Sequence, residues 1–204
     1  VNTKTTELEN MVNEKIDTHL TQIETQINDM YVNIKEFGAI DSDEVDSTQA
    51  IQNANDYCEE NNKTLYGIGN YLIKDTLNIT ANCDLSMATF IYEGENIAVK
   101  VGKEENATRL RTFKLPTIIK KTRTWLGNIG VQFINLVECD IHIKKISNFG
   151  VGSFFTSFST GCVYNNVYIK HLENNKVNLL IKPSNASGWV NENVFYGGRY
   201  QYFS

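Results

Sequence analysis

The sequence predicts a mostly β fold, a solenoid of stacked short strands, preceded by an α-helical coiled coil. Two observations carry this prediction: a hydrophobic heptad pattern near the amino terminus and a repeat of about 26 residues near the carboxyl terminus. Such a repeat leaves no room for a helix, and one rung cannot bury its own apolar side, so rungs must stack. We therefore expect a coiled-coil segment for trimerisation and attachment in residues 1–35, an entry strand and capping helix in 36–62, and rungs in 63–204.

The coil prediction rests on apolar residues at alternating steps of four and three, namely Ile16, Leu20, Ile23, Ile27, Met30 and Ile34. This spacing forms one stripe that partner helices must cover. The heptad places isoleucine at d (Ile16 and Ile23) and leucine at a (Leu20). This choice of residues favours a coiled coil of three helices over one of two, so we expect a homotrimer. The alternative is a lone amphipathic helix docked on its own globular part, but the polar residues around the stripe leave little to dock with.

Composition narrows the classes of partner. With 204 residues at 41% hydrophobic, the chain holds enough apolar material for one core of roughly 150 residues after the helix. The net charge is -5, and the densest cationic run is Lys120, Lys121 and Arg123, so we expect no nucleic-acid partner. No stretch approaches roughly 18 apolar residues, and the amino end lacks the regions of a secretory signal, so we expect no membrane insertion.

Metal and cofactor chemistry has no support in the residue spacing. The four cysteines form no Cys-x-x-Cys pair, and the three histidines are scattered. We therefore expect no metal site and no cofactor, and buried free thiols at Cys58, Cys83, Cys139 and Cys162.

The middle of the chain predicts one short helix and then strands. Asp46 or Ser47 can cap a helix that ends at 59–62, and its apolar positions are Ala50, Ile51, Ala54 and Tyr57. After it come short strand-like pieces separated by turn residues, such as 64–66, 71–73 and 77–79. Beyond Leu65 we expect no helix longer than one turn.

The repeat itself is clearest between 140–148 and 166–174, and a third copy opens at Asn193. This alignment predicts one interior column that contains Ile141, Val167 and Val194. The chain ends in the strand-like sequence Tyr200-Gln201-Tyr202-Phe203-Ser204, so we expect the rungs to continue beyond this sequence. The alternative architecture is an antiparallel sandwich with strands every 8 to 12 residues or so.

The stretch from residue 33 to 73 resembles the entry motif of the pectate-lyase-like right-handed parallel β-helix family. The resemblance rests on Asn33-Ile34-Lys35-Glu36-Phe37-Gly38-Ala39, on Asp46-Ser47-Thr48-Gln49-Ala50-Ile51-Gln52, and on Gly69-Asn70-Tyr71-Leu72-Ile73. Ile40 to Val45 replaces the family's glycine loop. Behind a trimeric coil, the motif is similar to tail spikes and tail fibres, the receptor-binding appendages of tailed bacteriophages. Residues 188–199 are similar to rungs in such proteins.

The resemblance implies a place on the virion, in a tail appendage outside the host cell. It implies three kinds of partner: two further copies of the chain, other virion tail or baseplate proteins bound through the amino-terminal part, and a host cell-surface glycan bound by regions beyond this sequence. The functional hypothesis is therefore the virion-proximal part of a trimeric tail spike or fibre that carries a rigid shaft for host attachment. A secreted pectin-lyase-like enzyme is disfavoured by the coil.

The enzymatic alternative is a polysaccharide or teichoic-acid depolymerase, a glycosidase or lyase of the same fold. A glycosidase needs two carboxylates roughly 5 to 9.5 Å apart, and the candidates are Glu138, Asp140, Glu173 and Glu192, the last beside Trp189 and Arg199. A lyase would need a basic residue near an acidic Ca²⁺ cluster. The acidic run Asp41, Asp43, Glu44 and Asp46 lies in the entry loop, where capping and solvation explain it better. We name no catalytic residue.

Overall fold

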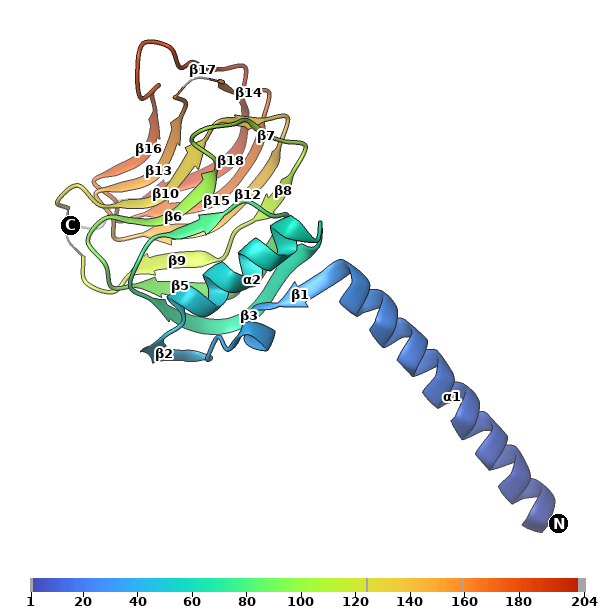
Figure 1. Cartoon of the computed structure of the whole chain (residues 1–204). Coiled ribbons are helices and arrows are strands. Elements are labelled where there is room, and N and C mark those ends of the chain that lie inside the picture. Colours follow the sequence, from blue (N-terminus) through green and yellow to red (C-terminus); the bar gives the residue numbers. More distant parts are fainter. Residues whose placement is uncertain (1, 124, 159, 202–204) are drawn as a thin grey trace.

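The computed structural model describes residues 2–123, 125–158 and 160–201. It begins with a long helix, α1 (Asn2–Met30), which extends away from the rest of the molecule (Figure 1). The predicted stripe lies open along this helix: Leu20 and Ile23 are each 51% exposed, and Met30 is 56% exposed. In one chain, α1 therefore leaves an apolar stripe in contact with water.

Ile34 does not belong to this stripe, and its assignment to the coil is wrong. The helix ends at Met30, β1 (Tyr31–Asn33) follows, and Ile34 begins the 3-10 helix η1 (Ile34–Phe37), where it is fully buried. The side chain of Asn33 accepts a hydrogen bond from the Lys35 N–H, while the Glu36 carboxylate accepts one from the Asn33 N–H. This reciprocal cap starts a new element and separates Ile34 from α1.

The strands described form parallel sheets, here called sheets 1, 2 and 3 (Figure 1). Along sheet 1 lie β1, β3 (Thr64–Ile73), β5 (Cys83–Tyr92), β8 (Thr112–Lys114), β12 (Asp140–Ser147), β15 (Asn166–Glu173) and β18 (Val194–Gln201). Two further strands join it: β2 (Ser42–Asp46) pairs with β3, and β9 (Thr117–Lys120) pairs with β5 and β12.

The other two sheets use shorter strands. Sheet 2 contains β4 (Leu77–Ile79), β6 (Ile97–Gly102), β10 (Ile129–Ile134), β13 (Val151–Thr156) and β16 (Val177–Ile181). Sheet 3 contains β7 (Thr108–Arg109), β11 (Leu136–Val137), β14 (Cys162–Val163) and β17 (Val190–Asn191). From β12 onward the chain visits sheets 1, 2 and 3 in turn and then returns to sheet 1, one strand further along. Each such circuit is called a rung below.

Strand pairing excludes one of the two architectures that the sequence left open. Every pairing among the described residues is parallel, so the antiparallel sandwich is wrong. Beyond Leu65 the described chain contains only strands and turns, as predicted. The repeat of 26 residues is confirmed between β12 and β15, where Ile141 pairs with Val167.

Val194 is not the third member of that column. Val167 pairs with Phe195, and Val194 pairs with Asn166 and is 48% exposed. The last circuit is 28 residues long at this point, as the contact between Asn165 and Asn193 shows. Because side chains alternate between the faces of a strand, an error of one residue in register reverses the direction of every side chain.

Helix α2 (Thr48–Glu60) closes the amino-terminal end of the stack. The Asp46 carboxylate accepts a hydrogen bond from the Thr48 N–H at 3.0 Å, so Asp46 rather than Ser47 supplies the side-chain cap. Ile51, Ala54 and Cys58 are fully buried against the first strands of sheets 1 and 2. The predicted apolar face is therefore fully buried at Ile51 and Ala54. Ala50 is partly buried and packs against the core, while Tyr57 is 39% exposed.

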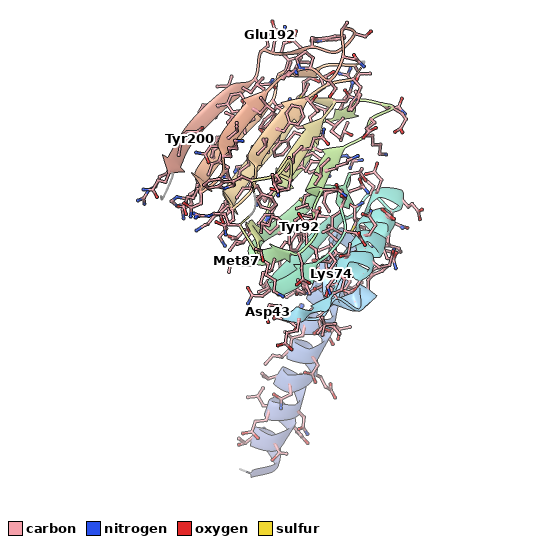
Figure 2. All side chains as sticks on the ribbon, turned by 90° about the vertical axis from the view of Figure 1, so that its left-hand side faces the viewer. Asp43, Lys74, Met87, Tyr92, Glu192 and Tyr200 are labelled. Carbon is pink, nitrogen blue, oxygen red and sulfur yellow. The ribbon has the colours of Figure 1, made fainter. Side chains whose placement is uncertain are left out.

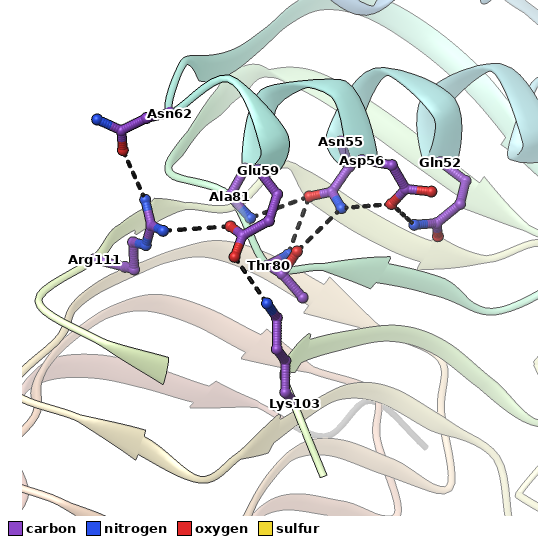
Figure 3. A network of polar contacts seen from close by, with 9 residues as sticks. All are labelled: Gln52, Asn55, Asp56, Glu59, Asn62, Thr80, Ala81, Lys103 and Arg111. Atoms are coloured by element: carbon purple, nitrogen blue, oxygen red, sulfur yellow. Dashed lines mark hydrogen bonds and ion pairs between the residues drawn. The ribbon is translucent and has the colours of Figure 1, made fainter. Parts of the chain in front are cut away.

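Polar contacts fasten α2 to the loops beside it (Figure 3). Asn55 is buried, and its side-chain oxygen accepts hydrogen bonds from the backbone N–H groups of Thr80 and Ala81. Glu59 forms ion pairs with Lys103 at 2.8 Å and with Arg111 at 3.4 Å. The helix thus satisfies backbone groups at the end of the stack as well as covering its apolar interior.

Candidate functional site

The outward face of sheet 1 carries a continuous column of polar and aromatic side chains. Strand register places Asp84 of β5, Lys114 of β8, His142 of β12, Tyr168 of β15 and Tyr196 of β18 side by side. Their neighbours along each strand, such as Ile141 and Val167, are buried. Because successive side chains of a strand point to opposite faces, the side chains of this column point to the outward face of the sheet.

Three rings in this column stack on one another. The His142 and Tyr168 rings lie 4.6 Å apart with planes 13° from parallel, and the Tyr168 and Tyr196 rings lie 4.8 Å apart at 12°. Both faces of the Tyr168 ring are thereby covered. Tyr168 is still 39% exposed, so solvent reaches it through the ring edge and the hydroxyl.

The three stacked rings of His142, Tyr168 and Tyr196 are called the aromatic ladder below. Beside His142 and Tyr168 lies an open depression of about 340 Å³. Its lining combines the ladder with lysines from successive strands: Ser86, Lys114, Leu115, His142, Ile143, Lys144, Tyr168, Ile169 and Lys170. This volume lies within the range of small-molecule sites, although the depression is open rather than enclosed. Its charged lining side chains are all basic.

These lysines differ in their partners. The Lys114 ammonium pairs with Asp84 at 2.8 Å, and the Lys144 ammonium donates to the Ser86 backbone oxygen at 2.7 Å. Within the described residues, neither Lys144 nor Lys170 forms an ion pair. The two face each other across β12 and β15, because the residues on either side of each lysine are paired in register.

Two of the predicted carboxylates fall in one column, at the corner before sheet 1. Glu138, Tyr164 and Glu192 all have positive φ angles near 55° (56°, 59° and 53°). A hydrogen bond with Glu192 raises the pKa of Tyr164. Glu138 and Glu192 belong to rungs separated by that of Tyr164, and two strand spacings are about 10 Å. No contact joins the two carboxylates within the described residues, and Glu192 is engaged by Tyr164, so the structure gives no support for the close pair that a retaining glycosidase needs.

The other predicted carboxylates have structural partners. Asp140 accepts a hydrogen bond from the Asn166 amide at 3.1 Å. Glu173 binds Lys145 at 2.8 Å and contacts the His171 ring at 3.3 Å. The hydrogen bond from Lys145 lowers the pKa of Glu173, so this carboxylate stays ionised.

The predicted grouping of Glu192 with Trp189 and Arg199 is not formed. Arg199 pairs in register with His171 at the far end of β18. Figure 2 shows Glu192 and Tyr200, the neighbour of Arg199, at opposite ends of this strand. Trp189 packs against Gly161, next to sheet 3. The contact is so close that a β-carbon on Gly161 would lie 2.6 Å from the indole nitrogen of Trp189.

The acidic entry loop serves the fold. Asp41 accepts a hydrogen bond from the Asn70 N–H, which lowers the pKa of this carboxyl, and it pairs with Lys35 at 3.3 Å. No group of acidic, histidine or cysteine side chains in the described part of the chain could hold a metal ion. All four cysteines are free and buried, as predicted, and burial raises the pKa of Cys58 and Cys162 to about 12.

The ladder and its lysines were not among the candidates from sequence, although the repeat contained the signal. Its alignment already placed His142 opposite Tyr168 and Lys144 opposite Lys170. Outward positions that repeat an aromatic or a charge mark a surface column in a stacked fold. The error of one residue in the last rung concealed Tyr196.

Comparison with known proteins gives a fold but no family. No family model matches this sequence, and no curated protein matches it. Among solved structures, the chain is similar to ORF18 of Geobacillus virus E2, with a TM-score of 0.58 and 16% sequence identity. The match covers 92% of this chain and 45% of ORF18, so the chain spans less than half the length of that protein. None of the helices described is long and apolar enough to cross a membrane.

Proposed function

We propose that the chain is part of a homotrimeric bacteriophage tail spike or tail fibre. The observation that carries this proposal is the half-exposed stripe of α1, which runs directly into stacked parallel sheets. Three such helices would bury Leu20, Ile23 and Ile27 against one another as a parallel coiled coil. The neighbour from a Geobacillus virus supports a phage origin.

In this proposal, the sheets form a right-handed parallel β-helix that serves as a rigid shaft. The circuit through sheets 1, 2 and 3 supports it, because each rung hydrogen-bonds to the rungs before and after it. A solenoid gives a long, stiff surface per residue, and three copies raise the effective concentration of weak binding sites. The amino-terminal part would attach to other tail or baseplate proteins, and the shaft would present sites for host cell-surface glycans.

The trimer is tested with Ile23→Asn combined with Ile27→Asn in the full chain. Buried amides at the seam would lack partners, at a cost of about 1 to 3 kcal/mol for each side chain and in each of three copies. We expect the wild-type chain to sediment as a trimer and the double variant as a monomer. Gln22→Asn combined with Thr25→Asn is the matched control, because both positions lie off the stripe, and it should remain trimeric. A wild-type monomer or dimer would contradict the proposal.

We also expect no depolymerase activity from this chain. Its candidate carboxylates are paired with other side chains or lie on separated rungs. The assay incubates the purified chain with host capsule or teichoic acid and measures reducing ends, unsaturated sugars and released phosphate-containing polymer. Turnover above a boiled control that is lost in Glu138→Gln or Glu192→Gln would favour the depolymerase instead.

A further inference from the structure

The outward face of sheet 1 carries a pair of like charges that has no acidic partner within the described residues, although the Lys144 ammonium is bound to the Ser86 backbone oxygen. Lys144 and Lys170 lie opposite each other on neighbouring strands, which are about 4.8 Å apart. Like charges in this position destabilise a sheet. Within the described residues no carboxylate pairs with either of them, whereas Lys145, next along the strand, pairs with Glu173. An anion in the adjacent depression would neutralise this positive charge.

The aromatic ladder beside the lysines also favours an anion. Stacking covers the faces of the Tyr168 ring and leaves its edge and hydroxyl to solvent. The edge of an aromatic ring is the positive end of its quadrupole. The side chains around the depression therefore present ammonium groups, ring edges and groups that can donate hydrogen bonds: Lys114, His142, Lys144, Tyr168 and Lys170.

We infer that this face, formed by β8, β12, β15 and β18, binds a linear anionic polysaccharide, whose negative groups contact the lysines while its hydroxyls bond to the ladder. A linear polymer fits because the donors repeat from strand to strand along the stack. Nucleic acid fits less well, because single strands bind by stacking bases on open aromatic faces, and both faces of the Tyr168 ring are covered. The inference deepens the proposed function, on which it rests for the source of the polymer, the host cell surface.

The test uses dextran derivatives that share one backbone. Phosphorylated dextran and carboxymethyl dextran carry the charge, and unmodified dextran does not. We expect the full chain to bind at least one charged derivative and not the neutral polymer, with affinity that falls as salt increases. In Lys144→Gln combined with Lys170→Gln, affinity should fall about tenfold or more, as expected for the loss of two charge-assisted contacts of about 1.4 kcal/mol in total.

The matched control is Lys74→Gln combined with Lys121→Gln, which removes the same charge beside Glu93, at another surface. It should bind as well as the wild type. Equal weakening in the control, equal binding of single-stranded DNA, or no binding of either charged dextran would overturn the inference.

A second copy of the chain is the competing occupant of this face. The coil variant Ile23→Asn, Ile27→Asn separates the two cases. If the trimer and the separated chains bind charged dextran with equal affinity per site, the face is open in the assembly, and the inference holds. Binding only by separated chains would show that another chain covers the face. If the wild-type chain does not sediment as a trimer but still binds charged dextran, the proposed assembly is wrong and the binding site stands.

Discussion

Replacement of Val167 by aspartate should severely destabilise the chain. Val167 is fully buried in β15, between Ile141 and Phe195 of the neighbouring strands. A carboxylate there has no partner, and even after its pKa rises on burial the cost is several kcal/mol. We expect a loss of about 4 kcal/mol or more, a large share of the roughly 5 to 15 kcal/mol that stabilises a typical domain. Circular dichroism during urea unfolding measures it.

The control for this change is Lys170→Asp in the same strand. Lys170 is exposed, and its replacement also removes the like charge opposite Lys144. Its unfolding midpoint should stay close to that of the wild type. If Val167→Asp unfolds at the wild-type midpoint, Val167 does not lie in an interior column, and the stacking of rungs described above is incorrect.

Sequence periodicity predicted the stack wherever rung length is constant. Between β12 and β15 the circuit repeats every 26 residues, and Ile141 and Val167 were correctly assigned to one column. The next circuit contains the longer connection between β16 and β17 and is 28 residues long at the corner before sheet 1. No local pattern indicates an insertion in a surface loop, because loops tolerate added residues at little cost. Val194 was therefore assigned to the wrong face.

The end of α1 shows a second limit of pattern analysis. Ile34 continues the heptad spacing, yet it is a core residue of the globular part. An apolar residue in phase with a helix has the same signature whether it faces a partner helix or the interior of the next element. The distinguishing signal is the capping pair Asn33 and Glu36, a pattern that starts a new helical element.

The candidate site was only partly predictable. Repeat alignment supplied the pairs His142 with Tyr168 and Lys144 with Lys170, but charge alone gave no reason to prefer them over other surface residues. Their relation becomes informative only when the strands are paired. Ring stacking, the depression and the lack of an acidic partner for Lys170 all depend on side chains from different rungs.

Replacement of Asn165 by leucine should destabilise the chain by about 3 kcal/mol. Asn165 is fully buried at the corner between β14 and β15. Its side-chain oxygen accepts a hydrogen bond from the Cys139 N–H at 2.9 Å, and its amide donates to the Leu136 oxygen at 2.9 Å and to Asn193 at 2.8 Å. Leucine has a similar volume but leaves the Cys139 N–H without this acceptor, at about 1 to 3 kcal/mol. It also removes the donors to Leu136 and Asn193, although Asn193 still accepts a hydrogen bond from the Asn165 N–H. Urea unfolding of the full chain measures the loss.

Two further variants show which hydrogen bonds matter. Asn165→Asp keeps an acceptor for the Cys139 N–H but loses both donor contacts, so it should also destabilise the chain. Asn166→Leu removes only the amide contact with Asp140 at the surface, and we expect a loss of less than about 1 kcal/mol. Equal losses in Asn165→Leu and Asn166→Leu would show that the buried amide adds nothing beyond an ordinary surface contact. A large loss only at Asn165 would show that this buried amide, and not apolar packing alone, stabilises the contact between successive rungs.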